Sequence, residues 1–344
     1  MEIEFRVVDA SQVDAVLGPA PIVRAKIQSV IDMPAMAGMP KLEEVAHAEG
    51  VPGEYGVHPT FAHGGEYRMR LAIEPLAGEP FGVEFLLPVL DADPRRKRSP
   101  RPPPFQVELT SRPKRPKAGQ PAELEFRIRS RDRPKQVHAA FEVVHEKLMH
   151  LLIVRADLAQ FGHQHPDIGS DGVFRLRYVF PSAGDFHLFV DTAPRGAGSQ
   201  VMLSKLRVQG KDAGRFDLAK ASAGDRSLVK RVEGTTVEVK TPGDSLPIKK
   251  TTGLTIHLTD AATGQAVTDL EPYLGAMGHL ILIHQDAVTF VHSHPDERIS
   301  GVGRDGTVPF LVRFPKPGLY RGWSQFQRQG SILTSDFILR AAGP

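Results

Sequence analysis

The sequence predicts an all-β chain built from three tandem β-sandwiches. Its 344 residues are enough for two or three domains of about 100–150 residues each. Apolar and polar residues alternate in many short segments separated by turn residues, a pattern typical of sandwich strands. A glycine–x–aromatic corner that leads into such a segment occurs once in each third of the chain: Gly65-x-Tyr67, Gly184-x-Phe186 and Gly318-x-Tyr320.

The strand candidates share this alternation, which predicts that one face of each strand is buried. In chain order they are residues 22–31, 67–73, 122–130, 150–154, 186–191, 235–240, 254–260, 279–283, 320–326 and 335–341. The best short helix candidate is KLEEVAHAE, residues 41–49. Because helical stretches are otherwise few, the pattern favours immunoglobulin-like or cupredoxin-like sandwiches.

Two segments are typical of linkers. Residues 91–104, DADPRRKRSPRPPP, combine proline with like charge, and both oppose helix and sheet. Residues 209–227 are the second candidate. The predicted organisation is therefore a sandwich at 1–92, a basic Pro-rich linker at 93–104, a sandwich at 105–210, a linker at 211–228 and a sandwich at 229–344.

The net charge of +3 is local, because residues 95–117 hold nine Lys or Arg and one Glu. We interpret this stretch as a solvated tether, with contact to a polyanion or an anionic membrane as the alternative. It lacks the interleaved aromatic residues of single-strand binders, so no nucleic-acid partner is expected.

Composition excludes several classes of site. The chain has no cysteine, which excludes disulfides, zinc–thiolate sites and thiol catalysis. No apolar run approaches the roughly 20 residues that span a bilayer, and MEIEFRVVDA lacks the features of a signal peptide. Either the protein is cytoplasmic, or a leader or membrane anchor is missing from this sequence.

The motif HxHPD occurs twice, in FGHQHPD at 161–167 and in FVHSHPD at 290–296. Residues 150–167 align without gaps to residues 279–296, and eight of the eighteen positions are identical. Three histidines keep one spacing in both copies. They are His150, His163 and His165 in the first copy, and His279, His292 and His294 in the second.

Strand periodicity predicts that these histidines converge. In an extended strand His163 and His165 project to one face, as do His292 and His294. A hairpin-like return would bring His150 or His279 beside its pair, and three imidazoles suit Cu(II), Zn(II) or Ni(II). Asp167 and Asp296 could then orient an imidazole N–H or cap a turn. The alternative is a duplicated turn, since His-Pro and Pro-Asp pairs form turns without any metal.

Methionines supply further candidate ligands. Met277 lies two residues before His279, and its soft thioether would favour Cu(I) there. In the first repeat the sequence MPAMAGM holds Met33, Met36 and Met39, which resembles a Cu(I)-binding loop. The alternative is core packing, because methionine fills irregular gaps between elements.

These residues also carry a family resemblance. VIDMPAMAGM at 30–39, followed by GEYGVHPTFAHGGEYRMRLAI at 53–73, resembles the YtkA-like domain of bacterial extracytoplasmic proteins. The third repeat, through LGAMGHLILIHQDAVTFVHSHPD at 274–296, is similar to modules found beside such domains in proteins linked to copper or heavy metals. The resemblance implies β-sandwiches, a periplasmic or otherwise extracytoplasmic location and a role in metal handling.

The leading hypothesis is a non-enzymatic metal-binding protein for copper, or alternatively zinc, that acts in metal buffering, delivery or resistance. Its expected partner is the metal ion, and a metal-donor or metal-acceptor protein is a second option. Association with a membrane through a missing anchor is a third. The competing hypothesis is an adhesion-like scaffold in which the histidines are packing features. An enzyme is not expected, because the sequence contains no nucleophile elbow, phosphate loop or clear acid–base pair near the histidines.

Overall fold

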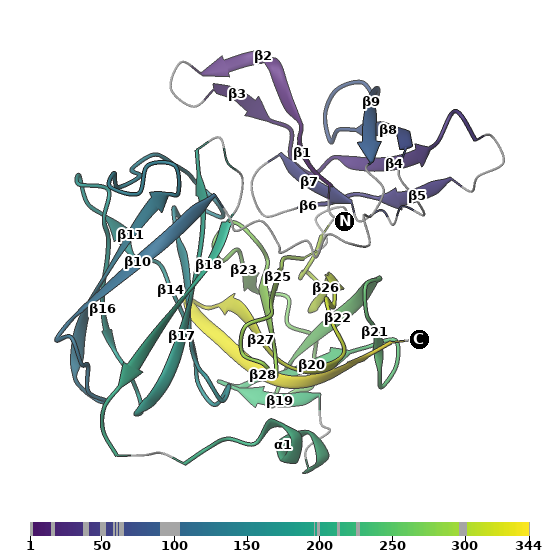
Figure 1. Ribbon diagram of the computed structural model, residues 1–344. Helices are drawn as coiled ribbons and strands as arrows, with labels where there is room; N and C mark the ends of the chain where they lie inside the picture. The colour runs from purple at the N-terminus through teal and green to yellow at the C-terminus, as the bar shows by residue number, and fades with distance from the viewer. Residues whose placement is uncertain are drawn as a thin grey trace. The chain divides into compact units, whose positions relative to one another are not determined.

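The computed structural model confirms the all-β prediction (Figure 1). It describes residues 3–14, 18–36, 41–48, 53–57, 59, 61, 65–89, 104–195, 197, 200–211, 214–224, 228–295 and 301–343. The chain divides into two compact units, residues 1–103 and residues 104–344. Each unit is described by itself.

The first unit contains two main sheets. A four-stranded sheet has the order β5-β4-β8-β9. Its strands are β4 (Lys26–Asp32), β5 (Leu42–Val45), β8 (Gly65–Glu74) and β9 (Phe81–Val89). A three-stranded sheet has the order β1-β7-β6, formed by β1 (Ile3–Arg6), β6 (His47–Ala48) and β7 (Glu54–Val57). Strands β2 (Val8–Asp14) and β3 (Gly18–Pro21) form a separate pair. Ile27, Tyr67 and Met69 from the larger sheet and Val57 from the smaller one share a buried core.

The helix predicted at residues 41–49 is wrong. The segment forms β5 and β6 instead, and β5 pairs antiparallel with β4 so that Ile31 lies opposite Leu42. Leu42 packs on the core of the unit and Ala46 is 4% exposed within it. Backbone pairing to the edge of an existing sheet, together with this burial, outweighs the modest helix propensity of the glutamates.

The second unit holds two further β-sandwiches, which we call the second sandwich (residues 104–209) and the third sandwich (residues 229–343). One sheet of the second sandwich contains β10 (Phe105–Arg112), β11 (Pro121–Ser130), β15 (Asp167–Ile168) and β16 (Phe174–Val179). The other contains β12 (Phe141–Glu142), β13 (His150–Arg155), β14 (Phe161–Gln164), β17 (Gly184–Pro194) and β18 (Gln200–Val208). Phe126, Leu151, Phe174 and Phe186 meet between these sheets.

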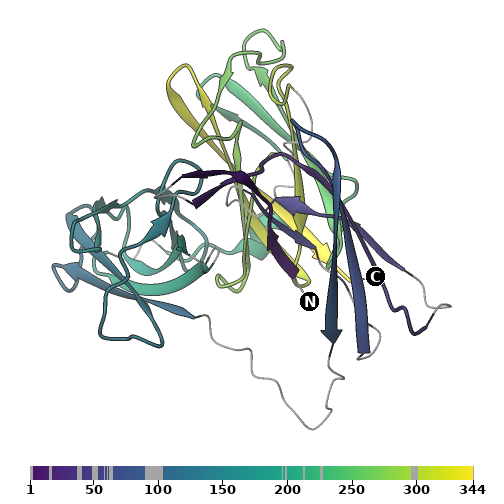
Figure 2. The same cartoon turned by 90° about the horizontal axis from the view of Figure 1, so that it is seen from above.

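The third sandwich repeats this plan. Its first sheet contains β19 (Val229–Val232), β20 (Thr235–Lys240), β22 (Thr251–Asp260) and β26 (Thr307–Arg313). Its second sheet contains β21 (Leu246–Pro247), β23 (Leu270–Glu271), β24 (His279–His284), β25 (Phe290–Ser293), β27 (Gly318–Arg328) and β28 (Ser331–Ala342). Figure 2 shows the strands of both sandwiches from above, blue-green for the second and green to yellow for the third.

The second and third sandwiches pack on one another through the sheets that carry β13 and β24. Along β13, Leu151 and Ile153 face the core of their own sandwich, whereas Leu152 and Val154 face a separate apolar cluster. Ile281 and other residues of the third sandwich belong to the same cluster. Period-two alternation thus makes these strands buried on both faces, and all six residues of β13 and of β24 are buried.

Contacts across this interface come in reciprocal pairs. Phe161 stacks on Trp323 with ring centroids 4.8 Å apart, and the corresponding Phe290 stacks on Phe189 at 5.4 Å. His187 donates a hydrogen bond to the carbonyl oxygen of Ala287. Its counterpart Arg321 donates to the carbonyl oxygen of Leu158. This is the pattern of an isologous interface, here formed by two repeats of one chain.

The segment predicted as the second linker contains regular structure. Helix α1 (Leu218–Gly224) lies within it (Figure 1). Leu218 is 8% exposed and packs with Phe216 on the apolar cluster between the two sandwiches. The connection therefore contributes to the interface that it spans.

The three corner glycines share one backbone conformation. Gly65, Gly184 and Gly318 have φ values of 147°, 139° and 137°, a region that favours glycine. A Cβ on Gly318 would lie 2.4 Å from Nε2 of His284, and one on Gly184 would lie 2.8 Å from Nε of Arg155. At Gly184 and Gly318 the glycine thus serves both the turn and the close approach of a side chain from the neighbouring strand of the sheet.

We expect Gly318→Ala to lower the free energy of unfolding by about 1–3 kcal/mol, because of the strained φ and the contact with the buried His284 ring. Gly253→Ala is the matched control, since no atom lies within 4 Å of its added Cβ. Because Gly253 lies within β22, its change to alanine should leave the free energy of unfolding unchanged or raise it by about 0.5 kcal/mol. Urea unfolding of both variants checks the prediction, and equal midpoints would contradict it.

Candidate metal centre

Each HxHPD motif lies on a hairpin that gathers its three histidines. Leu151 lies opposite Gln164 in the β13–β14 pair, so His150 and His165 meet at one end of the hairpin. His163, opposite Leu152, faces the interface with the third sandwich. The β24–β25 pair has the same register, with Leu280 opposite Ser293 and Ile281 opposite His292. In both hairpins the first histidine lies beside the other two, as the sequence predicts.

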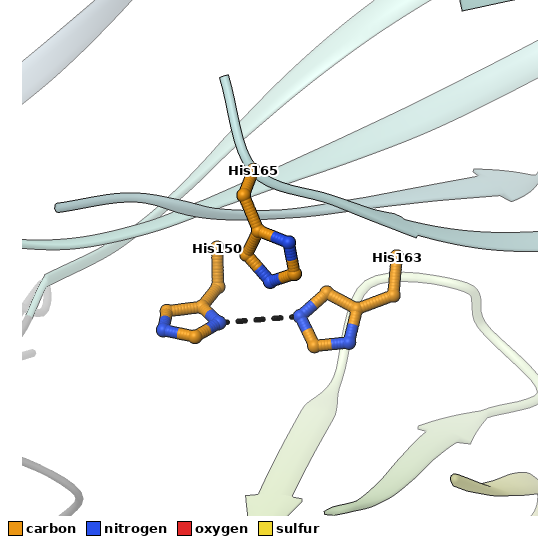
Figure 3. Close-up of side chains that lie close together, drawn as sticks. All are labelled: His150, His163 and His165. Atoms are coloured by element: carbon orange, nitrogen blue, oxygen red, sulfur yellow. Dashed lines mark hydrogen bonds between the residues drawn. The ribbon is translucent and has the colours of Figure 1, made fainter. Parts of the chain in front are cut away.

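The side chains form two compact triads. One ring nitrogen from each of His150, His163 and His165 lies within 4.8 Å of the other two, and the same holds for His279, His292 and His294. Figure 3 shows the first triad, in which the three rings turn toward one another. His150, His163 and His279 are 2%, 7% and 0% exposed, and the other three are half-buried. A triad of this size and composition could hold a transition-metal ion.

Backbone carbonyls fix the tautomer of the first histidine in each triad. Nε2–H of His150 donates to the carbonyl oxygen of Val144 at 2.9 Å. Nε2–H of His279 donates to that of Tyr273, the equivalent residue, at 2.8 Å. In both rings Nδ1 therefore carries the free lone pair. Nδ1 of His279 is buried without a hydrogen-bond partner among the described residues.

Side chains from the opposite sandwich orient the second histidine of each triad. Nδ1–H of His163 donates to Oε1 of Gln325 at 2.7 Å, and Nδ1 of His292 lies 3.4 Å from Oδ2 of Asp191. Asp191 and Gln325 both follow the corner glycine of their strand by seven residues. Nε2 then carries the free lone pair on His163, and also on His292 when that ring is neutral. Among the described residues, Nε2 of His165, His292 and His294 is buried without a partner.

The two triads thus offer the same donor set, one Nδ1 and two Nε2 atoms. In the first triad, Nδ1 of His150 faces Nε2 of His163 at 3.2 Å (the dashed line in Figure 3). With the tautomers above, neutral rings would point two lone pairs at each other, and a shared cation or proton would relieve that repulsion. A tetrahedral ion about 2.0 Å from two imidazole nitrogens holds them about 3.3 Å apart.

Burial keeps six rings of the cluster neutral. Loss of hydration is the main cause, and repulsion from neighbouring imidazoles adds to it. Together they lower the pKa of His150, His163, His279 and His294, and they lower the pKa of His145 and His165 to about 3. At neutral pH these rings are therefore unprotonated, which is the form that binds metals.

His145 is a seventh member of the cluster. It stacks on His294 across the interface with ring centroids 3.7 Å apart, and its Nε2 is buried without a partner among the described residues. The equivalent position in the third sandwich is Leu274, so the cluster is not fully symmetric. His145 lies five residues before His150 in the sequence, but only the interface brings it against His294.

Asp191 and Gln325 are the residues that sequence reasoning missed. The sequence does show that both residues lie seven positions after the corner glycine of their strand. It does not show that their side chains contact histidines of the opposite sandwich. The orienting role considered for Asp167 is wrong, because Asp167 begins β15 in the other sheet and is exposed. Asp296 lies outside the described residues.

The predicted methionine ligands differ in burial and in the residues that they contact. Met33 is 7% exposed and packs in the core of the first unit, where it contacts Gly65. Met36 is 49% exposed, and Met39 lies outside the described residues. Met277 is half-buried and packs beside Gly303. Core packing therefore accounts for Met33, while a Cu(I) site in this loop stays a prediction.

Among the residues that the structure places, no helix is long and apolar enough to cross a membrane.

Solved structures with some similarity to the chain include several bacterial adhesion proteins. A tetra-tandem repeat from the extending region of a large adhesion protein is 12% identical, covering 100% of this chain and 75% of that one at a TM-score of 0.23. The Escherichia coli adhesin FdeC is 12% identical over 92% of this chain and 85% of its own, also at 0.23. Invasin, a bacterial integrin-binding protein, is 10% identical over 99% and 56%, at 0.20. TM-scores this low carry no argument about function.

Family models match the sequence in three places, while a search of curated proteins found no match. The YtkA-like model matches residues 7–72, which confirms that part of the predicted resemblance. A model described as a domain of unknown function, DUF8832, matches residues 104–209 and again residues 230–343. These two matches cover the second and third sandwiches and well over half of the chain, and the chain therefore belongs to the DUF8832 family.

Proposed function

We propose that the second and third sandwiches bind two transition-metal ions, one at each histidine triad, with copper as the metal and zinc as the alternative. The observation that carries the proposal is the repeated donor set. In each triad hydrogen bonds fix the tautomers of two rings, and the remaining lone pairs converge. Imidazole ligands suit both metals, and Cu²⁺ binds most tightly among the divalent ions of the first row.

The energetics of burial support the same proposal. A polar atom buried without a partner costs about 1–3 kcal/mol, and the cluster contains five such ring nitrogens in the described residues. A bound ion would supply a partner for the four that belong to the triads. Metal binding would then stabilise the folded protein, because the ion binds the native state better than the unfolded chain.

We propose binding rather than catalysis, in a role of metal buffering, delivery or resistance. The candidate ligand nitrogens Nδ1 of His279 and Nε2 of His165, His292 and His294 have essentially no solvent-accessible surface. Such burial suits retention of an ion better than turnover of a substrate. A metal-donor or metal-acceptor protein is the partner class that fits this role.

We further propose that the protein acts outside the cytoplasm. The YtkA-like match at residues 7–72 supports this, because the resemblance implies an extracytoplasmic setting. In that setting the exposed thioether of Met36 would be a useful Cu(I) ligand, since it stays unprotonated in acid.

A structural scaffold is the second candidate function. The observation that favours it is the position of the cluster inside an interface that the reciprocal aromatic stacks already hold together. In that case the histidines would be packing residues, and the chain would serve as a series of β-domains. The two candidates differ in whether the triads retain an ion.

Metal content separates the two candidates. The full chain, exposed to excess Cu(II) or Zn(II) and then desalted, should retain about two ions per molecule by elemental analysis. The double variant His165→Ala/His294→Ala should retain well under one, because it removes one ligand from each triad. His138→Gln/His257→Gln, which changes two histidines outside the cluster, should still retain two. Equal metal content in all three proteins, or well under one ion in the unaltered chain, would overturn the proposed function.

Acid should destabilise the metal-free protein. The unfolded chain takes up protons on histidine near pH 6.5, whereas burial holds the pKa of these rings lower in the folded state, to about 3 for His145 and His165. The unfolded state therefore binds more protons below pH 6.5, and stability falls as the pH falls, by at most about 1.4 kcal/mol per pH unit for each histidine.

Urea unfolding of the metal-free chain at pH 8, 7, 6 and 5 measures this effect. The midpoint should change little between pH 8 and 7 and fall below pH 6.5. In His165→Ala the fall should be shallower, because one buried imidazole is removed. A midpoint that is flat or rises on acidification would show that the cluster is protonated in the folded protein.

A further inference from the structure

We propose that the two triads form a single dinuclear centre, in which two copper ions lie close enough to interact and each depends on both sandwiches. The proposal rests on the metal binding proposed above and adds that the two sites are one unit. Sequence spacing alone suggests two independent sites, one in each repeat. The interface between the sandwiches makes them adjacent.

Ring separations place the six imidazoles in one cluster. Within the triads, ring centroids lie 4.4 to 5.8 Å apart. Between the triads, His163 lies 6.0 Å from His279 and 6.3 Å from His292, and His150 lies 6.2 Å from His292. The distance between the triads is thus barely larger than the distances within them.

These separations limit how far apart two ions can be. An ion about 2 Å from a ring nitrogen lies about 3 Å from the ring centroid. Adding this to both ends of the shortest separation between triads places the ions at most about 12 Å apart, and closer when both lie in the space that the rings enclose. Two unpaired electrons at that range interact measurably.

Each half of the centre is oriented by the other sandwich. Gln325 of the third sandwich accepts the Nδ1–H bond of His163, and Asp191 of the second sandwich accepts that of His292. Groups that orient a ligating histidine in this way typically change metal affinity by 10–100-fold when they are removed. The centre is therefore complete only where the two sandwiches are docked.

Electron paramagnetic resonance of the full chain tests the coupling. At one Cu(II) per chain, His292→Ala/His294→Ala should give the spectrum of an isolated ion, because only the first triad remains intact. The unaltered chain at two Cu(II) should give a spectrum that is broadened, or has lost integrated intensity, relative to two isolated ions. Two retained coppers with the summed spectrum of two isolated ions would overturn the dinuclear centre and leave the proposed function intact. Retention of well under one ion would overturn both.

A second measurement tests the dependence on the opposite sandwich. In the His292→Ala/His294→Ala background, Gln325→Leu should weaken copper binding at the remaining triad by about 10–100-fold. Gln327→Leu is the matched control on the same strand, because Gln327 bonds to Glu271 instead of to a histidine. Quenching of Trp323, the only tryptophan of the chain, reports binding in titrations of both variants. Equal copper affinity in the two variants would overturn the orienting role of Gln325.

Discussion

The packing of the second sandwich on the third is the interaction on which the rest of the site depends. It buries the outer faces of β13 and β24, whose inner faces pack in the cores of their own sandwiches, and it buries ring nitrogens of the histidine cluster. That burial keeps six of the imidazoles neutral and leaves several ring nitrogens without a hydrogen-bond partner among the described residues. Without the interface the same histidines would be ordinary side chains on an exposed sheet, hydrated and free to titrate near pH 6.5.

Duplication explains why the interface and the site have the same symmetry. The stack of Phe161 on Trp323 repeats as Phe290 on Phe189, and the bond from His163 to Gln325 repeats as the contact of His292 with Asp191. An isologous contact brings equivalent positions near its axis, so residues beside that axis meet their own counterparts. His145, with Leu274 as its counterpart, breaks the symmetry and makes the two halves chemically different.

Much of this could be predicted from the sequence, because strand alternation and the corner glycines are local signals. The hairpin that gathers each triad follows from the spacing of His150, His163 and His165 together with period-two geometry. The roles of Asp191 and Gln325 could not be predicted, since they depend on how two sandwiches dock. The strand at Leu42–Val45 could not be predicted for a related reason, because its conformation depends on pairing with β4, which is separate from it in the sequence.

The central claim is that converging imidazoles hold metal ions at this interface. X-ray absorption spectroscopy of the copper-loaded full chain tests it most directly, since the spectrum reports the ligands around the ion. We predict three imidazole nitrogens per copper at about 2.0 Å. A spectrum dominated by oxygen ligands, or by sulfur from the methionine loop, with no imidazole contribution would contradict the account.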